Sequence, residues 1–403
     1  MSDSPDLSTA IAPTNSDAVP KLLSEIATTG DAYSKASNSI LARRELLAKA
    51  RELVRALESP RDMMLQHVWS QPCNIMAISF GVQTGLWTTM AKNGDGPQKA
   101  IDLARQLGIQ EELLQRMMRH IAASGYIDMT APDEYTPNSF SNPAILHPSF
   151  LRAHDWLREK GYTCPTDNLD TPFQAAHNTT LHLFAYLQAN PPHAQQFQDH
   201  MQAYLLGRPQ WMDEGFYPIQ ERVLDGFATA ADIDDAVLFV DVAGGLGHYT
   251  EALLSKFPAI PGRLILQDLP PVIESIQELH PRIERMGYDF FTEQPVKGAR
   301  VYYMHTVLHD WPDEKAAEIA SGVKRAMQPG YSRLLVHENV IPPMAQDREQ
   351  TTLDLIMMTH FGGKERSAAE WFDLLEGRCG LKVMKIWTPI NGIESVIECE
   401  RPE

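Results

Sequence analysis

The sequence predicts an α/β protein in which a doubly wound, mainly parallel sheet follows a helical N-terminal domain. From position 236 onward, short apolar runs alternate with segments of helical periodicity, as a parallel sheet covered by helices requires. A glycine-rich turn follows the first of these runs. The 403 residues exceed the usual size of a single core, so a second domain or an oligomerisation element is expected.

The N-terminal part divides into a tail, a long helix and a small domain. Residues 1–38 are expected to form a loosely ordered tail, because the first twenty positions are rich in Ser, Thr, Asp and Pro. Between Ser39 and Glu58, leucine, alanine and valine recur at helical spacing, which predicts an amphipathic helix that needs a partner surface. Residues 75–142 then read as short helices and a hairpin, an order typical of a winged helix.

Winged helices often bind DNA, but the charge of this chain argues against that function. Between Gly81 and Asn142 there are five basic and seven acidic residues, and the whole chain has a formal net charge of -17. Nucleic-acid phosphates require a surface rich in Lys and Arg, so no nucleic-acid partner is expected. We interpret residues 39–142 as a packing and dimerisation domain. A DNA-binding or regulatory protein remains the alternative.

Cysteine spacing and hydropathy indicate the compartment. The four cysteines are scattered without paired spacing, which favours reduced thiols over a disulfide framework or a zinc site. No stretch approaches the 18 or so apolar residues of a membrane span. We therefore expect a soluble, cytoplasmic protein with no membrane partner.

Residues 231–403 carry the expected sheet. Its strands are predicted at 237–242, 263–267, 300–304 and 333–337, with an antiparallel terminal pair at 382–386 and 394–398. Residues 143–230, rich in aromatic side chains and prolines, are expected to form a helical linker that lines a substrate pocket. In such sheets ligands bind at the carboxyl ends of the parallel strands.

The turn after the first strand predicts a nucleotide-type pocket. Gly244, Gly245 and Gly247 let the backbone approach a ligand without an intervening Cβ. The third small residue of a dinucleotide fingerprint is replaced by Thr250, which disfavours an NAD-dependent dehydrogenase. Asp268 ends the next strand, where a carboxylate can accept from ribose hydroxyls. A ribose site without a pyrophosphate clamp fits S-adenosylmethionine (SAM). A tight turn with no ligand is the alternative.

Candidate catalytic residues follow the later strands. His309 comes after the strand at 300–304, Glu338 after the next strand, and Glu365 within a glycine loop at 362–366. A carboxylate that accepts from Nδ1 of a histidine leaves Nε2 free to take a proton, so this set predicts an oriented general base.

A metal site is the alternative use of the same part of the chain. It would be formed from His305, His309, His337 and Glu338. Because no paired-acid motif accompanies these histidines, we expect no metal.

Four further motifs carry a family resemblance. They are QDLPPVI at 267–273, VLHDWPDEKA at 307–316, HENVIPP at 337–343 and GGKER at 362–366. In this order and spacing, the sequence resembles the plant and fungal small-molecule O-methyltransferases related to caffeic acid O-methyltransferase. The resemblance covers most of the chain. It implies a Rossmann-like, cation-independent SAM-methyltransferase domain and a homodimer formed through residues 39–142.

The resemblance also implies roles for individual residues. His309 would be the catalytic base, with Glu338 and Glu365 beside it. The cofactor site would consist of the backbone of Gly244 and Gly245, Asp268 at the ribose, Asp289 and Phe290 at the adenine, and His305 at the methionine end.

Three positions depart from the family pattern. Ala243 replaces the first glycine of the turn, a change expected to cost little. His305 stands in place of Lys or Arg, and Phe290 in place of a frequent Met. Met357 and Met358 fall where relatives pack methionines against a flat substrate, although a core role is equally open.

The predicted function is SAM-dependent O-methylation of a phenolic or enolic hydroxyl on a small specialised metabolite, in a fungal pathway. The alternative from the same family is a non-methylating enzyme that catalyses a dehydration or pericyclic reaction and keeps SAM as a fixed positive charge.

Overall fold

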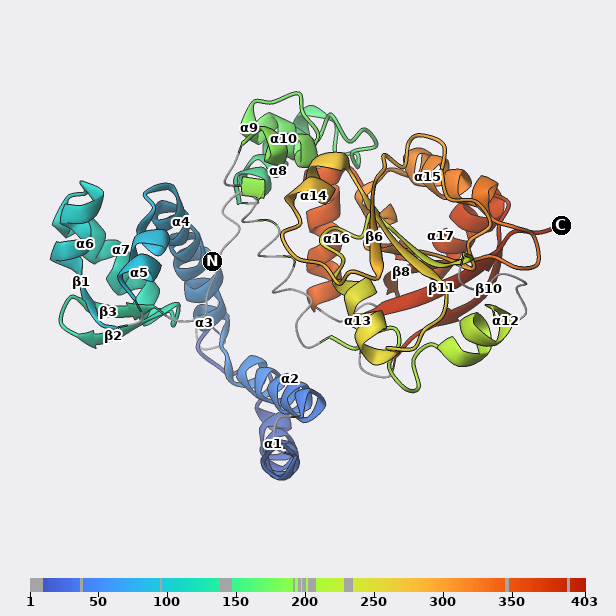
Figure 1. Cartoon of the computed structure of the whole chain (residues 1–403). Helices are drawn as coiled ribbons and strands as arrows, with labels where there is room; N and C mark the ends of the chain where they lie inside the picture. The colour runs from blue at the N-terminus through green and yellow to red at the C-terminus, as the bar shows by residue number, and fades with distance from the viewer. Residues whose placement is uncertain are drawn as a thin grey trace. The chain divides into compact units, whose positions relative to one another are not determined.

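The computed structural model describes most of the chain in two compact units. The described residues are 10–36, 39–94, 96–137, 147–190, 193–194, 197, 201, 208–227, 235–344, 348–389 and 392–403. The N-terminal unit comprises Met1–His147 with Gln196–Gly207, and the C-terminal unit comprises Pro148–Gln195 with Arg208–Glu403 (Figure 1). No helix among these residues is both long and apolar enough to cross a membrane.

Two packed helices open the N-terminal unit, α1 (Val19–Lys35) and α2 (Ile40–Leu57). The Ser39 side chain accepts from the Ala42 amide at 3.3 Å, which confirms the predicted start of the amphipathic helix. The prediction of a tail over residues 1–38 is wrong for α1: Leu22 is buried, and Lys49 of α2 pairs with Glu25 at 3.0 Å. Apolar residues of α1 at helical spacing find the partner surface on α2. Residues 1–9, 37 and 38 lie outside the described residues.

The rest of the N-terminal unit has the predicted order of helices followed by a hairpin. Its elements are α3 (Pro60–Met64), η3 (Leu65–Ser70), α4 (Gln71–Gln83), α5 (Leu86–Asn93), β1 (Gln98–Lys99), α6 (Ala100–Leu107), α7 (Glu111–Ala123), β2 (Ile127–Ala131) and β3 (Glu134–Pro137). Strand β3 lies between β1 and β2 in an antiparallel sheet, which gives a winged-helix arrangement.

The segment predicted at 143–230 does not form a unit of its own. Its helices α8 (His147–Glu159), α9 (Pro172–His177) and α10 (Leu183–Ala189) belong with the later α16 (Arg348–Phe361) in the C-terminal unit. The buried Phe173 ring, for example, lies 6.2 Å from the His360 ring of α16. Apolar and aromatic packing against α16 therefore accounts for the place of these helices in the C-terminal unit.

The C-terminal unit contains the predicted sheet, in the order β10-β11-β8-β7-β4-β5-β6 with β9 beside β8. Strands β4 to β8 run parallel, whereas β11 is antiparallel to β8 and to β10. The strands are β4 (Val237–Val242), β5 (Arg263–Asp268), β6 (Ile283–Gly287), β7 (Val301–His305), β8 (Arg333–Ile341), β9 (Arg366–Ser367), β10 (Lys382–Trp387) and β11 (Glu394–Glu400). The doubly wound fold with an antiparallel end is confirmed.

Strands β6 and β9 were not predicted. β6 lies at the edge of the sheet and carries Glu284 and Arg285, so it lacks the apolar run that marks a central strand. β9 has only two residues, too few for a periodic pattern.

Helices cover both faces of the sheet (Figure 1). One face packs on α15 (Asp313–Ala326), α17 (Ala368–Phe372) and η6 (Asp373–Arg378). On the other face, Phe239 and Tyr303 stack with Trp211, and Tyr303 also lies near Tyr249 of α13 (His248–Lys256). Successive residues of a strand point to opposite faces, so His337 and Glu338 of β8 serve different sides of the sheet.

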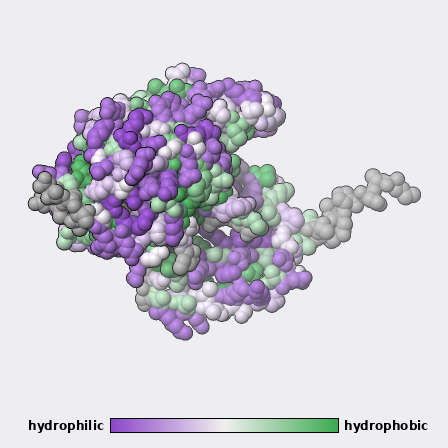
Figure 2. All heavy atoms as spheres, turned by 90° about the vertical axis from the view of Figure 1, so that its right-hand side faces the viewer, coloured by the Kyte–Doolittle hydropathy of each residue, from purple (hydrophilic) through white to green (hydrophobic). Residues whose placement is uncertain are grey.

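One face of the molecule carries both polar and apolar areas. Hydrophilic residues cover much of the face in Figure 2, with hydrophobic areas between them.

All four cysteines are free, which confirms the prediction of no disulfide.

The turn after β4 stores strain at Ala243. Its φ is +59°, a left-handed conformation that costs an L-residue about 1–2 kcal/mol. The expectation that alanine costs little at this position is therefore wrong. The backbone must reverse here to carry Gly244 over the end of β4, and a glycine would do so without strain.

Arg366 braces the turn that follows β7. This fully buried side chain donates at 2.9 Å to the carbonyls of Leu308 and Trp311, and at 2.9 Å to Asp313 at the start of α15. The donors of one guanidinium thereby fix both sides of η5 (Leu308–Asp310).

We expect Arg366→Met to destabilise the protein by about 2–4 kcal/mol, because it leaves buried acceptors without a donor. The measurement is urea unfolding followed by tryptophan fluorescence. Arg105→Met, which removes an exposed i,i+3 pair with Asp102, is the control and should change stability by no more than about 0.5 kcal/mol. Equal unfolding midpoints for the two variants would contradict a bracing role.

Candidate active site

His309 lies at the centre of a buried cluster of carboxylates. It belongs to η5, the turn between β7 and α15, and the chain enters this turn through Thr306 at φ +51°. His309 Nδ1 donates to Glu365 Oε1 at 2.7 Å and lies 3.6 Å from Glu338 Oε2. Its Nε2 lies 3.5 Å from Asp310 Oδ1, long for a hydrogen bond. The structure therefore brings the three predicted catalytic residues together.

Glu338 is fixed by the backbone of the same turn. Its Oε1 accepts from the amides of Val307 at 2.9 Å and Leu308 at 2.8 Å. Its Oε2 and the Oε2 of Glu365 are buried and have no hydrogen-bond partner among the described residues. Unsatisfied buried oxygens are uncommon in folded proteins and are typical of a site that binds something further.

The cluster changes the proton affinity of its members. Burial alone would lower the pKa of His309, but the charges on Glu338, Glu365 and Asp310 outweigh burial and raise this pKa well above its usual range. Burial raises the pKa of Glu365, and it raises the pKa of Asp310 to about 7. These groups titrate together rather than one by one.

The glycine turn and Asp268 form a second part of the site. The Gly245 amide donates to Asp268 Oδ2 at 2.8 Å, and the Leu269 amide donates to Oδ1 at 2.7 Å. A Cβ on Gly244 would lie 2.4 Å from Asp241 Cγ, so only glycine fits there. At Gly245 the corresponding direction is open, with no atom within 4 Å. A carboxylate beside an open backbone turn suits a ribose, so these residues fit a SAM-type cofactor.

Asp241 has a role that sequence reasoning did not assign. This buried residue of β4 accepts from Thr250 Oγ1 at 2.6 Å, and burial raises its pKa to about 6. Thr250, the residue that breaks the dinucleotide pattern, thus holds an acid beneath the glycine turn. The signal was present in the sequence, as an acid inside an apolar strand.

Asp289 and Phe290 follow the carboxyl end of β6, which is parallel to β5. Asp289 is exposed, and its carboxylate accepts from the Phe291 amide at 3.0 Å. The Phe290 ring meets the Trp311 ring edge-on at 5.8 Å, which places it beside the turn that carries His309. Phe290 thus borders the His309 turn, while the Asp289 side chain faces outward.

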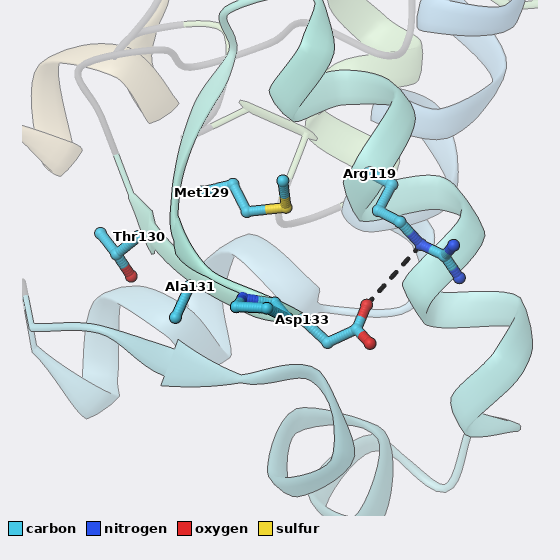
Figure 3. Close-up of a pocket in the computed structure, with 6 residues that line it drawn as sticks. Arg119, Met129, Thr130, Ala131 and Asp133 are labelled. Atoms are coloured by element: carbon cyan, nitrogen blue, oxygen red, sulfur yellow. Dashed lines mark ion pairs between the residues drawn. The ribbon is translucent and has the colours of Figure 1, made fainter.

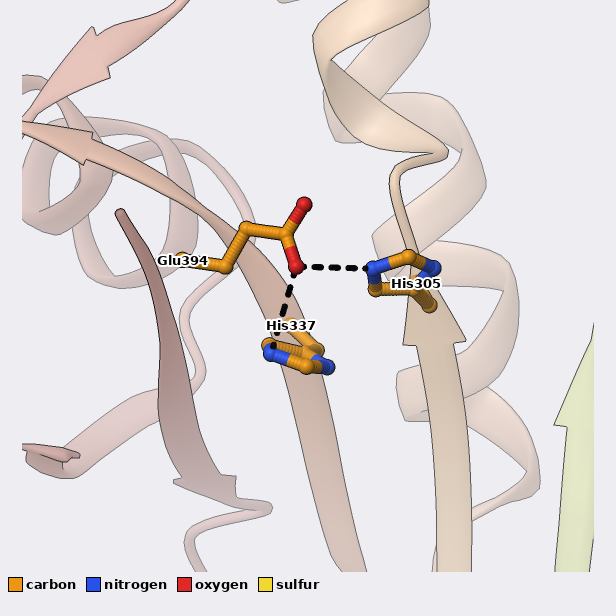
Figure 4. A group of neighbouring side chains, drawn as sticks. All are labelled: His305, His337 and Glu394. Carbon is orange, nitrogen blue, oxygen red and sulfur yellow. Dashed lines mark hydrogen bonds and ion pairs between the residues drawn. The ribbon is translucent and has the colours of Figure 1, made fainter. Parts of the chain in front are cut away.

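His305 belongs to a different cluster on the opposite face of the sheet (Figure 4). Its Nε2 lies 3.2 Å from Glu394 Oε2 and 3.3 Å from the Tyr249 hydroxyl. The same Glu394 oxygen lies 3.8 Å from His337 Nε2, while Arg208 pairs with the other oxygen. The structure therefore separates His305, the last residue of β7, from His309, four positions further along the chain.

Burial and neighbouring groups shift the pKa values of two members of this second cluster. Burial lowers the pKa of His337 to about 3, so this imidazole is neutral. Burial would raise the pKa of Glu394, but His305 and Arg208 lower it far below its usual range. The Arg208–Glu394 pair joins residues 186 positions apart, which no local sequence pattern could reveal.

The four residues considered as a metal site in the sequence lie in two separate groups. His305 and His337 group with Glu394, whereas His309 and Glu338 group with Glu365. In each group the ligand atoms come within 4.8 Å of one another. The four residues considered as one metal site therefore do not converge, and the expected absence of a metal stays a prediction.

A shallow hollow in the N-terminal unit offers no comparable chemistry. Arg119 and Met129–Asp133 line it, and Arg119 pairs with Asp133 at 3.6 Å (Figure 3). The hollow contains one mutually neutralised ion pair at the tip of the β2–β3 hairpin.

Comparisons with known proteins identify the family. A family model described as an O-methyltransferase domain matches residues 154–380. The chain is 36% identical to "O-methyltransferase mpaG" of Penicillium brevicompactum, over 94% of this chain and 98% of that protein.

Solved structures agree with this match over 95% of the chain. OxaC in complex with SAH and oxaline has a TM-score of 0.79 at 27% identity, with 98% of that chain covered. A structure described as a pericyclic reaction enzyme has a TM-score of 0.77 at 27% identity, with 100% of that chain covered. The chain therefore belongs to the family of SAM-dependent small-molecule O-methyltransferases.

Proposed function

We propose that this enzyme transfers a methyl group from SAM to a phenolic or enolic hydroxyl of a small secondary metabolite, with His309 as general base. The observation that carries the proposal is the 2.7 Å hydrogen bond from His309 Nδ1 to the buried Glu365. A carboxylate at Nδ1 fixes the tautomer in which Nε2 can accept a proton. The relative OxaC, solved with SAH and oxaline, supports a small-molecule substrate.

The protein's own residues would act mainly by positioning. When bound, SAM supplies a methyl group already activated on a sulfonium. His309 Nε2 removes the hydroxyl proton, and Glu365 and Glu338 stabilise the imidazolium that results. Because Glu338 is tied to the amides of Val307 and Leu308, it also fixes the turn that sets the direction of Nε2.

We infer that the cofactor binds across the glycine turn. Asp268 would hold the ribose, the backbone of Gly244 and Gly245 would approach the adenosine, and Asp289 and Phe290 would border the adenine. The open direction at Gly245 supports this arrangement. His305 would face the methionine end from the Glu394 cluster.

A non-methylating reaction is the second candidate, because the chain is as similar to a pericyclic reaction enzyme as to OxaC. The two functions differ in the fate of a labelled methyl group. If substrate disappears without label transfer, the non-methylating reaction replaces methyl transfer. The complete His309, Glu338 and Glu365 set favours methyl transfer.

We expect His309→Ala to lower kcat by about 10²- to 10⁴-fold, the range of general acid–base catalysis, and to leave SAM affinity nearly unchanged. Asp268→Ala should do the reverse and weaken SAM binding more than it lowers kcat. Label transfer from methyl-labelled SAM measures the first quantity, and isothermal titration with SAM measures the second. Unchanged turnover in the His309 variant would remove this residue from the mechanism.

The raised pKa of His309 predicts the pH dependence. As the pH falls through this raised value, Nε2 becomes protonated and can no longer accept a proton, so kcat/KM should fall. The acid limb should therefore lie above the ordinary histidine value of 6.5. Glu365→Gln removes one charge that raises this pKa, so it should move the limb to lower pH and also lower the maximal rate. A limb that stays in place in this variant would exclude His309 as its origin.

We also propose that the enzyme is a homodimer formed through the N-terminal unit. Six apolar residues of this unit, each at least half exposed, lie on α1, α2, η3 and α4: Leu23, Val54, Leu57, Val68, Trp69 and Met76. Large exposed apolar patches mark protein–protein interaction sites, and these side chains would supply the apolar surface of the dimer interface.

Light scattering tests the dimer. Val68→Glu with Trp69→Glu should yield a folded monomer, whereas Leu151→Glu, at an exposed position of the C-terminal unit, should leave the dimer intact. A dimer that survives the double substitution would contradict this interface.

A further inference from the structure

His182 lies in an aromatic cluster beside the catalytic turn. It precedes α10, and its ring stacks on Trp311 with centroids 4.8 Å apart and planes 10° apart. The Phe184 ring lies 5.3 Å away, and the Phe361 ring lies 6.1 Å away near the end of α16. One imidazole thus stands among three large aromatic rings.

One polar atom of this cluster is unsatisfied. His182 Nε2 is buried and has no hydrogen-bond partner among the described residues. Burial lowers the pKa of His182 to about 4, so the ring is neutral at pH 7. A buried polar group without a partner costs about 1–3 kcal/mol, so a phenyl ring here would stabilise the stack better if packing were the only purpose.

Two of the rings around His182, those of Trp311 and Phe361, are held close to His309. Trp311 is two residues beyond His309, and Arg366 holds its carbonyl. Phe361 precedes Gly362 and Gly363, where a Cβ on Gly363 would lie 2.0 Å from the His309 carbonyl oxygen. The Lys364 amide then donates to that same oxygen at 3.1 Å. The positions of the Trp311 and Phe361 rings relative to His309 are therefore restricted.

We propose that His182 is a substrate-binding residue whose Nε2 forms a hydrogen bond with a second oxygen of a flat aromatic substrate. This inference rests on the proposed function, which places the reacting hydroxyl at His309. The neighbouring aromatic rings favour a planar substrate ring, and Nε2 is the polar atom beside them that has no hydrogen-bond partner among the described residues. The preferred substrates are thus phenols with at least two oxygen substituents rather than simple monophenols.

The test combines a protein substitution with a substrate deletion. His182→Phe keeps a flat ring on Trp311 and removes the nitrogen. Orcinol and m-cresol, which differ by one hydroxyl, are the simplest substrate pair. For the wild type, kcat/KM should be about tenfold higher with orcinol than with m-cresol, as one hydrogen bond provides. In His182→Phe this preference should disappear, through a loss on orcinol alone.

Two further variants separate binding from packing. His182→Asn supplies an amide that can hydrogen-bond, so it should restore part of the preference. His154→Phe changes an exposed histidine of α8 in the same unit and should keep the wild-type preference. If His182→Phe loses activity equally on both phenols, or binds SAH more weakly, the residue supports Trp311 and the proposal is wrong.

Binding measurements distinguish this inference from the proposed function. Isothermal titration of both phenols into SAH-loaded protein reports the same preference without any methyl transfer. A preference in binding that depends on His182, in an enzyme that transfers no label, would uphold the role of His182 and reject the methyltransferase. If instead the enzyme transfers label, and wild type and His182→Phe each bind both phenols with equal affinity, the methyltransferase is upheld and the role of His182 is rejected.

Discussion

The organisation of the catalytic half depends on burying two carboxylates beside one imidazole. Removing Glu338 and Glu365 from water is unfavourable unless charge and hydrogen bonds compensate. His309 donates one of these hydrogen bonds, to Glu365, and the two amides of the turn at 307–308 donate two more, to Glu338. The turn and Glu338 therefore stabilise each other, because the amides of the turn donate to the carboxylate that they keep in place.

The same turn is held from outside by a second ion. Arg366 reaches the carbonyls on both sides of η5, so donors and acceptors of one short segment are satisfied by groups far along the chain. Trp311, which follows that segment, connects the His309 turn to Phe290 and to His182. These three segments are thereby packed together through one ring.

The sequence predicted what local pattern can determine. Apolar runs predicted the central strands, and the glycines predicted the turn. His309 lies in the loop where it was expected, whereas Glu338, expected after its strand, lies inside β8 because that strand continues to Ile341. The edge strand β6 was missed because charged residues interrupt it, and α1 was missed because its partner surface is on another helix. His182 and the Arg208–Glu394 pair depend on contacts between distant segments, for which neither periodicity nor spacing gives a signal. The cost of alanine at position 243 was underestimated because the sequence does not reveal the φ of this residue.

Adjacent residues of β8 serve the two clusters: His337 points toward Glu394 and Glu338 toward His309. Side chains alternate along a strand, so a pairing error of one residue would exchange the two. Such an error would bury a carboxylate against Glu394 and remove Glu338 from the neighbourhood of His309. The wrong register is thus electrostatically unfavourable on both faces at once, so these two adjacent side chains favour the correct pairing of β8 as well as completing the two clusters.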